Sequence, residues 1–88
     1  MYYVYVLFSQ KTKRLYTGST ENLKQRLREH NEGMGGKFSR MGIPFTLVFY
    51  EAFLSKTDAR KQELFYKSGY GREVLKDKIE NSLKLLGA

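Results

Sequence analysis

The sequence predicts an α+β domain in which helices pack against a small antiparallel or mixed sheet, in the order β-β-α-β-α-α. Two aromatic-rich apolar segments near the start are separated by a polar turn, and a third such segment follows at residues 45–53. The intervening and final segments repeat apolar residues at helical spacing. With 88 residues, of which 41% are hydrophobic and 28% charged, we expect one globular domain over residues 1–88.

The first two strands are predicted to form an antiparallel hairpin. Residues Tyr2–Phe8 are β-branched or aromatic almost throughout, residues 9–14 are polar and turn-like, and Leu15-Tyr-Thr-Gly18 has the composition of a short strand. Because side chains alternate along a strand, Tyr3 and Tyr5 are expected to share one face of the sheet. The hairpin therefore carries several tyrosines, whose usual role in a strand is packing.

The next segment is predicted to be a helix of about three turns. Ser19 or Thr20 supplies a hydroxyl that can cap the first turn. Glu21 suits the positive end of the helix dipole, and Gly33 suits the end of the helix.

Polar side chains interrupt the inward face of this helix. Leu23 and Leu27 mark the face toward the core. Arg26 and His30 fall on the same arc, one helical turn apart. One interpretation is structural: Arg26 extends its charged end to solvent, and His30 is a hydrogen-bonded, partly buried histidine. The other is that both side chains reach a common functional point at the edge of the core.

A third strand and further helices complete the predicted fold. The glycine-rich loop at residues 33–44 ends at the only proline, and residues Phe45–Phe53 are predicted to be a strand. Ser55 is expected to cap a helix that Gly69 or Gly71 ends. A C-terminal amphipathic helix is predicted from apolar residues at helical spacing, namely Leu75, Ile79, Leu83 and Leu86.

A carboxylate lies on the apolar stripe of the helix that Ser55 begins. Glu63 shares this stripe with Ala59, Tyr66 and Tyr70. An inward carboxylate needs a partner, because burying an isolated charge is costly. Two interpretations are open. Glu63 forms an internal ion pair with Arg26, or it is an oxygen ligand for a hard divalent cation, with Arg26 nearby for phosphate.

The net charge of +7 favours an anionic partner, with nucleic acid ahead of a membrane surface. The excess lies mainly in residues 1–44, which hold eight basic and three acidic residues. Because phosphate contacts dominate such binding, we expect weakly sequence-selective, shape-directed binding of DNA. The predicted nucleic-acid contacts lie in the hairpin turn and the glycine-rich loop: Lys11, Lys13, Arg14, Lys37, Phe38 and Arg40.

The composition excludes several classes of protein. Without cysteine the chain has no disulfide and no thiolate metal site, so a metal must take oxygen or imidazole ligands. The longest apolar run, Tyr2–Phe8, is far too short to span a bilayer, and no signal-peptide charge pattern precedes it. We therefore expect a cytoplasmic protein with no membrane partner.

Several of these residues together resemble the signature of the GIY-YIG nuclease superfamily. Tyr3-Val4-Tyr5, ten intervening residues and Tyr16-Thr17-Gly18 resemble its paired tripeptides. The segment Asn22–His30 resembles the helix that follows them, and Ala59–Glu63 resembles the later helix that carries the metal-binding glutamate. The similarity is to small stand-alone members and, more distantly, to the N-terminal nuclease domain of the UvrC repair protein.

The sequence departs from the family pattern at three positions. Tyr3 replaces the glycine of the first tripeptide, and Thr17 replaces the isoleucine of the second. Ser19 stands where the UvrC-like branch carries a lysine, so any role of that amine is missing.

The resemblance implies a three-stranded antiparallel sheet flanked by helices, and one divalent cation, Mg²⁺ or Mn²⁺, held by Glu63. It assigns the catalytic positions to five residues: Tyr5, Tyr16, Arg26, His30 and Glu63. The planar fork of Arg26 suits developing negative charge on a phosphate. The general base stays open between Tyr5, Tyr16 and a relay through His30.

These observations lead to the hypothesis of a metal-dependent DNA endonuclease that hydrolyses phosphodiester bonds, with selectivity for DNA structure, in DNA repair or recombination. The alternative is a non-catalytic nucleic-acid-binding module on the same scaffold. Such a module would need only the basic residues, so the presence of all five catalytic-type side chains favours the enzyme.

Overall fold

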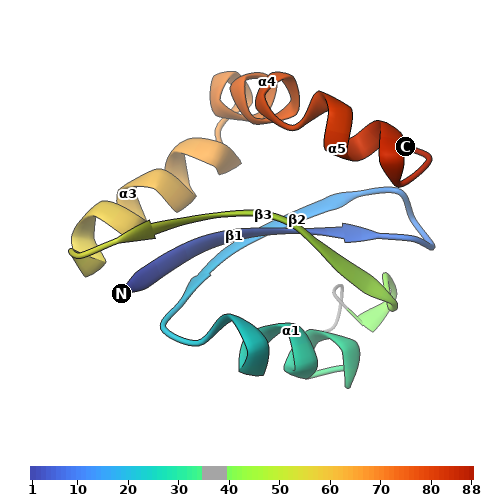
Figure 1. Ribbon diagram of the computed structural model, residues 1–88, viewed down its shortest axis with the longest axis horizontal. Helices are drawn as coiled ribbons and strands as arrows, with labels where there is room; N and C mark the ends of the chain where they lie inside the picture. Colours follow the sequence, from blue (N-terminus) through green and yellow to red (C-terminus); the bar gives the residue numbers. More distant parts are fainter. Residues whose placement is uncertain (35–39) are drawn as a thin grey trace.

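The computed structural model describes residues 1–34 and 40–88 and confirms the predicted α+β class. Its elements are β1 (Tyr2–Ser9), β2 (Leu15–Thr20), α1 (Leu23–Asn31), β3 (Phe45–Phe53), α3 (Lys56–Lys67), α4 (Gly69–Lys78) and α5 (Glu80–Leu85). The strands form one antiparallel sheet in the order β2-β1-β3, so β2 and β3 are its edges. Helix α1 covers one face of the sheet, and α3, α4 and α5 cover the other (Figure 1).

Alternation along β1 divides the core between the two faces of the sheet. Val4 and Val6 are fully buried and pack with residues of α3 and α4. Tyr5 and Leu7 are buried on the other face, where they cluster with Phe45 and the leucines of α1. Fully burying an apolar side chain of this size stabilises the folded state by roughly 1.5–3 kcal/mol. Both helical layers are therefore anchored through the central strand.

Helix α1 begins later than predicted, because β2 extends to Thr20. Asn22 is the N-cap, and its side chain accepts a hydrogen bond at 3.0 Å from the backbone N–H three residues later. The predicted cap at Ser19 or Thr20 is therefore wrong, since both residues belong to the strand. The predicted end is confirmed: Gly33 follows the helix with a φ of +84°, a conformation that favours glycine.

A tight corner joins α3 to α4. Helix α3 ends at Lys67, before both glycines expected to end it, and the side chain of Ser68 accepts a hydrogen bond at 3.1 Å from the Gly71 N–H. A Cβ atom at Gly71 would collide with the carbonyl group of Phe65, so the corner requires glycine. The predicted stripe is wrong at Tyr70, which is 75% exposed because the helix ends before it. The other three stripe positions are buried.

The C-terminal helical segment is divided at Ile79. This residue has φ −112° and ψ 19°, outside the helical region, and separates α4 from α5. Ile79 is nevertheless 3% exposed and packs in one cluster with Leu75 and Leu83. The predicted apolar spacing is thus confirmed, and the turn keeps residues on both sides of it against the sheet. No helix within residues 1–34 and 40–88 combines the length and apolar character needed to cross a membrane.

Candidate active site

The phenol of Tyr5 crosses the edge strand β2 at Gly18. The two residues are direct partners in the β1–β2 ladder. A Cβ atom at Gly18 would overlap the hydroxyl and ring of Tyr5, so a side chain at this position would exclude the phenol. The glycine of the second tripeptide therefore allows the Tyr5 hydroxyl to reach the outer edge of the sheet.

Helix α1 presents Arg26 and His30 to this hydroxyl. Arg26 Nε donates a hydrogen bond to the Tyr5 oxygen at 3.3 Å, and His30 Nε2 lies 3.1 Å from the same oxygen. The guanidinium can only donate, and the direction of the hydrogen bond between the phenol and His30 Nε2 is set by the tautomer of the histidine. The predicted convergence of Arg26 and His30, one turn apart on α1, is confirmed, and their meeting point is Tyr5.

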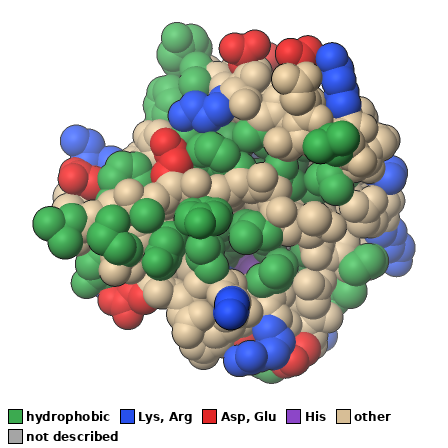
Figure 2. Space-filling view, viewed as in Figure 1, with side chains coloured by type: hydrophobic (Ala, Val, Ile, Leu, Met, Phe, Trp, Pro, Cys, Tyr) green, Lys and Arg blue, Asp and Glu red, His purple; other side chains and the backbone are tan. Residues whose placement is uncertain are grey.

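Burial sets the protonation of this cluster. It raises the pKa of Tyr5 above its usual 10.0, although Arg26 acts in the opposite direction. Burial, together with the charge of Arg26, lowers the pKa of His30 below 6.5. His30 is 6% exposed, and only a small patch of the histidine reaches the face shown in Figure 2. At neutral pH both groups are therefore uncharged, which disfavours a Tyr5 phenolate.

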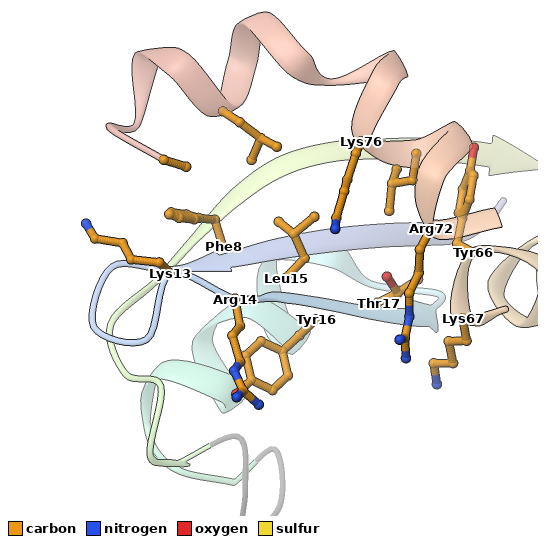
Figure 3. Close-up of a pocket in the computed structure, with 13 residues that line it drawn as sticks. Phe8, Lys13, Arg14, Leu15, Tyr16, Thr17, Tyr66, Lys67, Arg72 and Lys76 are labelled. Carbon is orange, nitrogen blue, oxygen red and sulfur yellow. The ribbon is translucent and has the colours of Figure 1, made fainter. Parts of the chain in front are cut away.

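Tyr16 lies on the same face of the sheet as Tyr5, two residues before Gly18 along β2. Its ring packs edge-to-face against Phe45, with centroids 5.1 Å apart. Within residues 1–34 and 40–88 its hydroxyl makes no hydrogen bond, and the side chain lines a cavity at the β2 edge. Figure 3 shows the ring on the opposite side of β2 from Lys76. The Tyr16 hydroxyl is thus close to the site without being part of the Tyr5 cluster.

Glu63 approaches the edge of β2 from the other face. The residue is 4% exposed, and its Oε1 accepts hydrogen bonds from Ser19 Oγ at 2.7 Å and from Arg60 at 2.9 Å. Its Oε2 accepts one from Lys67 Nζ at 2.8 Å. Burial alone would raise the pKa of Glu63, but these three donors outweigh it and hold the pKa below 4.5. The carboxylate is therefore ionised at neutral pH.

The predicted ion pair between Glu63 and Arg26 is wrong. Arg26 NH1 pairs instead with Glu29 at 3.1 Å, within α1. The physical reason is that α1 and α3 lie on opposite faces of the sheet (Figure 1). The two halves of the site approach each other at neighbouring residues of β2, because Gly18 admits Tyr5 and the next residue binds Glu63. The charge of Glu63 contributes to the raised pKa of Tyr5.

Glu63 is suited to bind a divalent cation whose other ligands are water and phosphate oxygens. Within residues 1–34 and 40–88 no three His, Asp or Glu side chains are grouped so as to hold a metal. A carboxylate has about four lone-pair positions, and three donors occupy positions on Glu63. The position that is left suits one bond to Mg²⁺ or Mn²⁺, which often bind through one or two carboxylates, water and substrate phosphates. The donor set does not fit an all-protein cage.

The predicted nucleic-acid contacts that the structure describes are exposed side chains. Lys11, Lys13 and Arg14 are exposed in the β1–β2 turn, and Arg40 is exposed before β3. Lys37 and Phe38 lie outside the described residues. The hairpin cations thus remain candidates for phosphate contacts.

The sequence profile of the GIY-YIG catalytic domain matches residues 1–78. The chain belongs to this family. GIY-YIG catalytic domains are typically nucleases, so the family implies a nucleic-acid substrate.

Similar proteins carry the UPF0213 name. The UPF0213 protein in the ldhD 5′ region of Pediococcus acidilactici is 43% identical over 77 residues, which cover 85% of this chain and 78% of that protein. A UPF0213 protein of Clostridium perfringens is 43% identical over 67 residues, covering 76% of this chain and 71% of the relative. The solution NMR structure of a UPF0213 protein from Bacillus halodurans has 38% identity and a TM-score of 0.51, and covers 85% of this chain and 82% of that chain.

The GIY-YIG signature alone does not indicate the partners of the glutamate. Ser19 is a departure from the family pattern, yet its hydroxyl binds Glu63 directly. Arg60 and Lys67 lie three residues before and four residues after Glu63, spacings that place helical side chains next to each other. The helical spacing was therefore a usable signal for the two cations, whereas the contact with Ser19 depends on how α3 docks on β2.

Proposed function

We propose that this chain is a divalent-metal-dependent DNA endonuclease that hydrolyses phosphodiester bonds in DNA repair or recombination. The observation that carries the proposal is the meeting of two chemical groups at neighbouring residues of β2. One is the Tyr5–Arg26–His30 cluster at Gly18, and the other is the ionised Glu63 at Ser19. A family whose members are typically nucleases supports the same reaction class.

Arg26 is suited to binding a phosphate oxygen. Its side chain is 32% exposed, and its partner Glu29 is similarly accessible at 30%. An exposed ion pair of this kind contributes little stability, so a phosphate can displace Glu29 at small cost. Tyr5 and His30 hold the guanidinium in place and are positioning residues in this scheme.

Tyr16 is the phenol available to a nucleophilic water. The Tyr5 oxygen already accepts a hydrogen bond from Arg26 and lies 3.1 Å from His30 Nε2. The Tyr16 side chain lines the cavity at the β2 edge, and its hydroxyl has no hydrogen-bond partner among the described residues. Hydrolysis requires the water to lose a proton as its oxygen attacks phosphorus. Tyr16 would accept that proton as a phenolate, after releasing its own proton to solvent.

Glu63 would hold the divalent cation, which when bound would neutralise phosphate charge and polarise the scissile bond. Arg60 and Lys67 have side chains that are 61% and 49% exposed, so both can turn from Glu63 toward phosphate oxygens. While Ser19, Arg60 and Lys67 donate to it, the carboxylate is ionised, because these bonds outweigh burial and lower the pKa of Glu63.

Cleavage of supercoiled, single-stranded and branched DNA with Mg²⁺ or Mn²⁺ tests the proposal. Glu63→Gln removes the charge and keeps the shape, so we expect cleavage to fall by about 100-fold or more, as for other groups that act on transition-state charge. Glu73→Gln on α4 is the matched control, because Glu73 is exposed and has no ion pair within the described residues. DNA binding should persist in both variants.

A non-catalytic DNA-binding module is the second candidate. It is favoured by the three donors that already surround Glu63, and by the lack of a multi-residue metal cluster among the described residues. This candidate replaces the nuclease if wild type and Glu63→Gln bind DNA equally and neither cleaves any of the three substrates with either metal.

A further inference from the structure

A cavity of about 700 Å³ lies between the β1–β2 hairpin and helices α4 and α5. Its volume falls within the roughly 300–1,000 Å³ of typical ligand sites. The accessible apolar wall comes from the half-buried Leu15 of the sheet and Leu83 of α5, together with the buried side chains of Phe8 and Leu75. Five basic side chains surround this apolar wall: Lys13, Arg14, Lys67, Arg72 and Lys76. We call this feature the basic groove.

The charge of the basic groove is almost uncompensated. No Asp or Glu side chain lines it, and among its five cations only Lys67 forms an ion pair with an acidic side chain within the described residues. Arg72 and Lys76 lie one turn apart on α4, and Arg14 lies across from them on the hairpin. Figure 3 shows Lys13 at the hairpin end of the groove and Arg72 at the other end. Such a row of like charges attracts a polyanion.

The basic groove begins at the candidate active site. Lys67 lines the groove and also donates to Glu63 at 2.8 Å. Thr17 lines the groove and precedes Ser19, another Glu63 partner, by two residues on the same face of β2. Tyr16 lines it from the other side of the strand. A polyanion bound beside Glu63 and Lys67 can therefore continue into the groove, where basic side chains still contact it.

We propose that the basic groove binds an unpaired DNA strand that leads away from the cleavage site. This inference rests on the proposed nuclease function and names the part of the substrate that the protein holds. Phosphates would lie on Arg14, Arg72 and Lys76, and unpaired bases would enter the apolar part of the groove. Paired bases are stacked inside a duplex and cannot enter such a cavity, whereas unpaired bases can turn outward. The protein would thus recognise a flap or a single-stranded end.

Fluorescence anisotropy with labelled oligothymidylate in EDTA tests the proposal without requiring cleavage. We expect Arg72→Gln/Lys76→Gln to weaken single-strand binding about tenfold or more. It should also reduce the slope of log affinity against log salt by about 1.4, since each phosphate contact on a single strand contributes about 0.7. Lys24→Gln/Lys61→Gln removes the same charge from exposed positions on α1 and α3 and should change affinity much less.

Two further measurements distinguish the occupant. If the groove variant weakens duplex binding as much as single-strand binding, or if both double variants act alike, the proposal is overturned. An oligonucleotide of abasic sites should bind several-fold more weakly than oligothymidylate, and equal affinity would show that bases do not enter the groove. A wild type that cleaves nothing would remove the nuclease proposal and leave these binding results standing.

Discussion

Two buried tyrosines in this molecule each accept a hydrogen bond from a cationic side chain, but they lie on opposite faces of the sheet. Tyr5 binds Arg26 and His30 on the α1 face of the sheet. Tyr66, on the α3 face, is 1% exposed and accepts a hydrogen bond from Lys78 Nζ at 3.1 Å. Burial raises the pKa of both phenols. The residue type and the adjacent cation therefore do not distinguish a site from a structural cluster.

The difference lies in what completes each cluster. Tyr66 donates to Glu51 at 2.6 Å, Gln62 donates to both, and Lys78 lies 3.6 Å from the same carboxylate. This cluster ties β3, α3 and α4 together and neutralises its own charge. The Tyr5 cluster instead ends at an edge strand beside Glu63, and its cation is paired only with a partly exposed glutamate. The side chains of Arg26 and Lys78 are similarly exposed, at 32% and 42%, so the two clusters differ in position: only the Tyr5 cluster approaches Glu63 at β2.

Among the variants of the two clusters, replacing Arg26 and replacing Lys78 should give the largest difference in kcat. Arg26→Gln should lower kcat for DNA cleavage by about 10²–10³, the usual cost of losing one donor to transition-state charge. Lys78→Gln should leave kcat near wild type, because within the described residues Lys78 contacts the Tyr66 cluster and the Phe49 ring and neither Tyr5 nor Glu63. Cleavage rates at saturating DNA measure both. Equal losses of kcat would mean that the comparison between the two clusters is wrong.

Adding one methyl group at Gly18 tests whether the Tyr5 phenol must pack directly against the backbone of β2. Gly18→Ala should destabilise the fold by about 1–3 kcal/mol, because the new Cβ overlaps the phenol. Gly69→Ala is the control, since no atom lies within 4 Å of a Cβ there. Urea unfolding of both variants gives the free energies. A Gly18→Ala variant as stable as Gly69→Ala would show that the close approach is not required.

Removing each hydroxyl separates stability from activity. Tyr66→Phe removes the hydroxyl that bonds Glu51 and Lys78, although Gln62 still donates to Glu51, and should lower the free energy of unfolding by about 1–3 kcal/mol, with kcat unchanged. Tyr5→Phe should lower kcat about tenfold, because Arg26 loses the group that positions it. Thermal unfolding and cleavage rates are measured together. If Tyr66→Phe reduces kcat more than Tyr5→Phe does, the assigned roles are reversed.

Acid should affect the two clusters in different pH ranges. Burial and the charge of Arg26 lower the pKa of His30 below 6.5 in the folded protein. As the pH drops below 6.5, His30 therefore binds a proton more readily in the unfolded chain, and the free energy of unfolding falls. The pKa of Glu51 is below 4.5, because bonds from Tyr66, Gln62 and Lys78 outweigh the opposing effect of burial. Its contribution is present above pH 4.5 and is lost as the pH falls through the lowered pKa.

Two variants, one in each cluster, test this pH dependence of the unfolding free energy. His30→Gln should flatten the dependence of unfolding free energy on pH between 7 and 5, and Glu51→Gln should flatten it only below 4.5. Urea titrations across these ranges measure both. A His30→Gln variant that keeps the wild-type slope between pH 7 and 5 contradicts the assignment.

Local periodicity was sufficient to predict the elements and which way their side chains face. The strand Phe45–Phe53 is confirmed at both ends, and the inward arc of α1 carries Arg26 and His30 as expected. The predictions were wrong where the end of a helix or strand depends on contacts with residues far away in the sequence. Thr20 pairs in β2 instead of capping α1, and Tyr70 lies beyond the corner that Gly71 permits.

The amino-acid sequence by itself determined the fold class, because spacing along a chain specifies which residues share a face. The resemblance of its motifs to the GIY-YIG signature indicated the family and the five candidate catalytic side chains. Only the tertiary structure decided that Glu63 binds Ser19, Arg60 and Lys67, and that Tyr5 is the point where Arg26 and His30 meet. The reason is that a helical period does not say which face of a sheet the helix covers. Here α1 and α3 cover opposite faces, so their polar groups can meet only around the edge of β2.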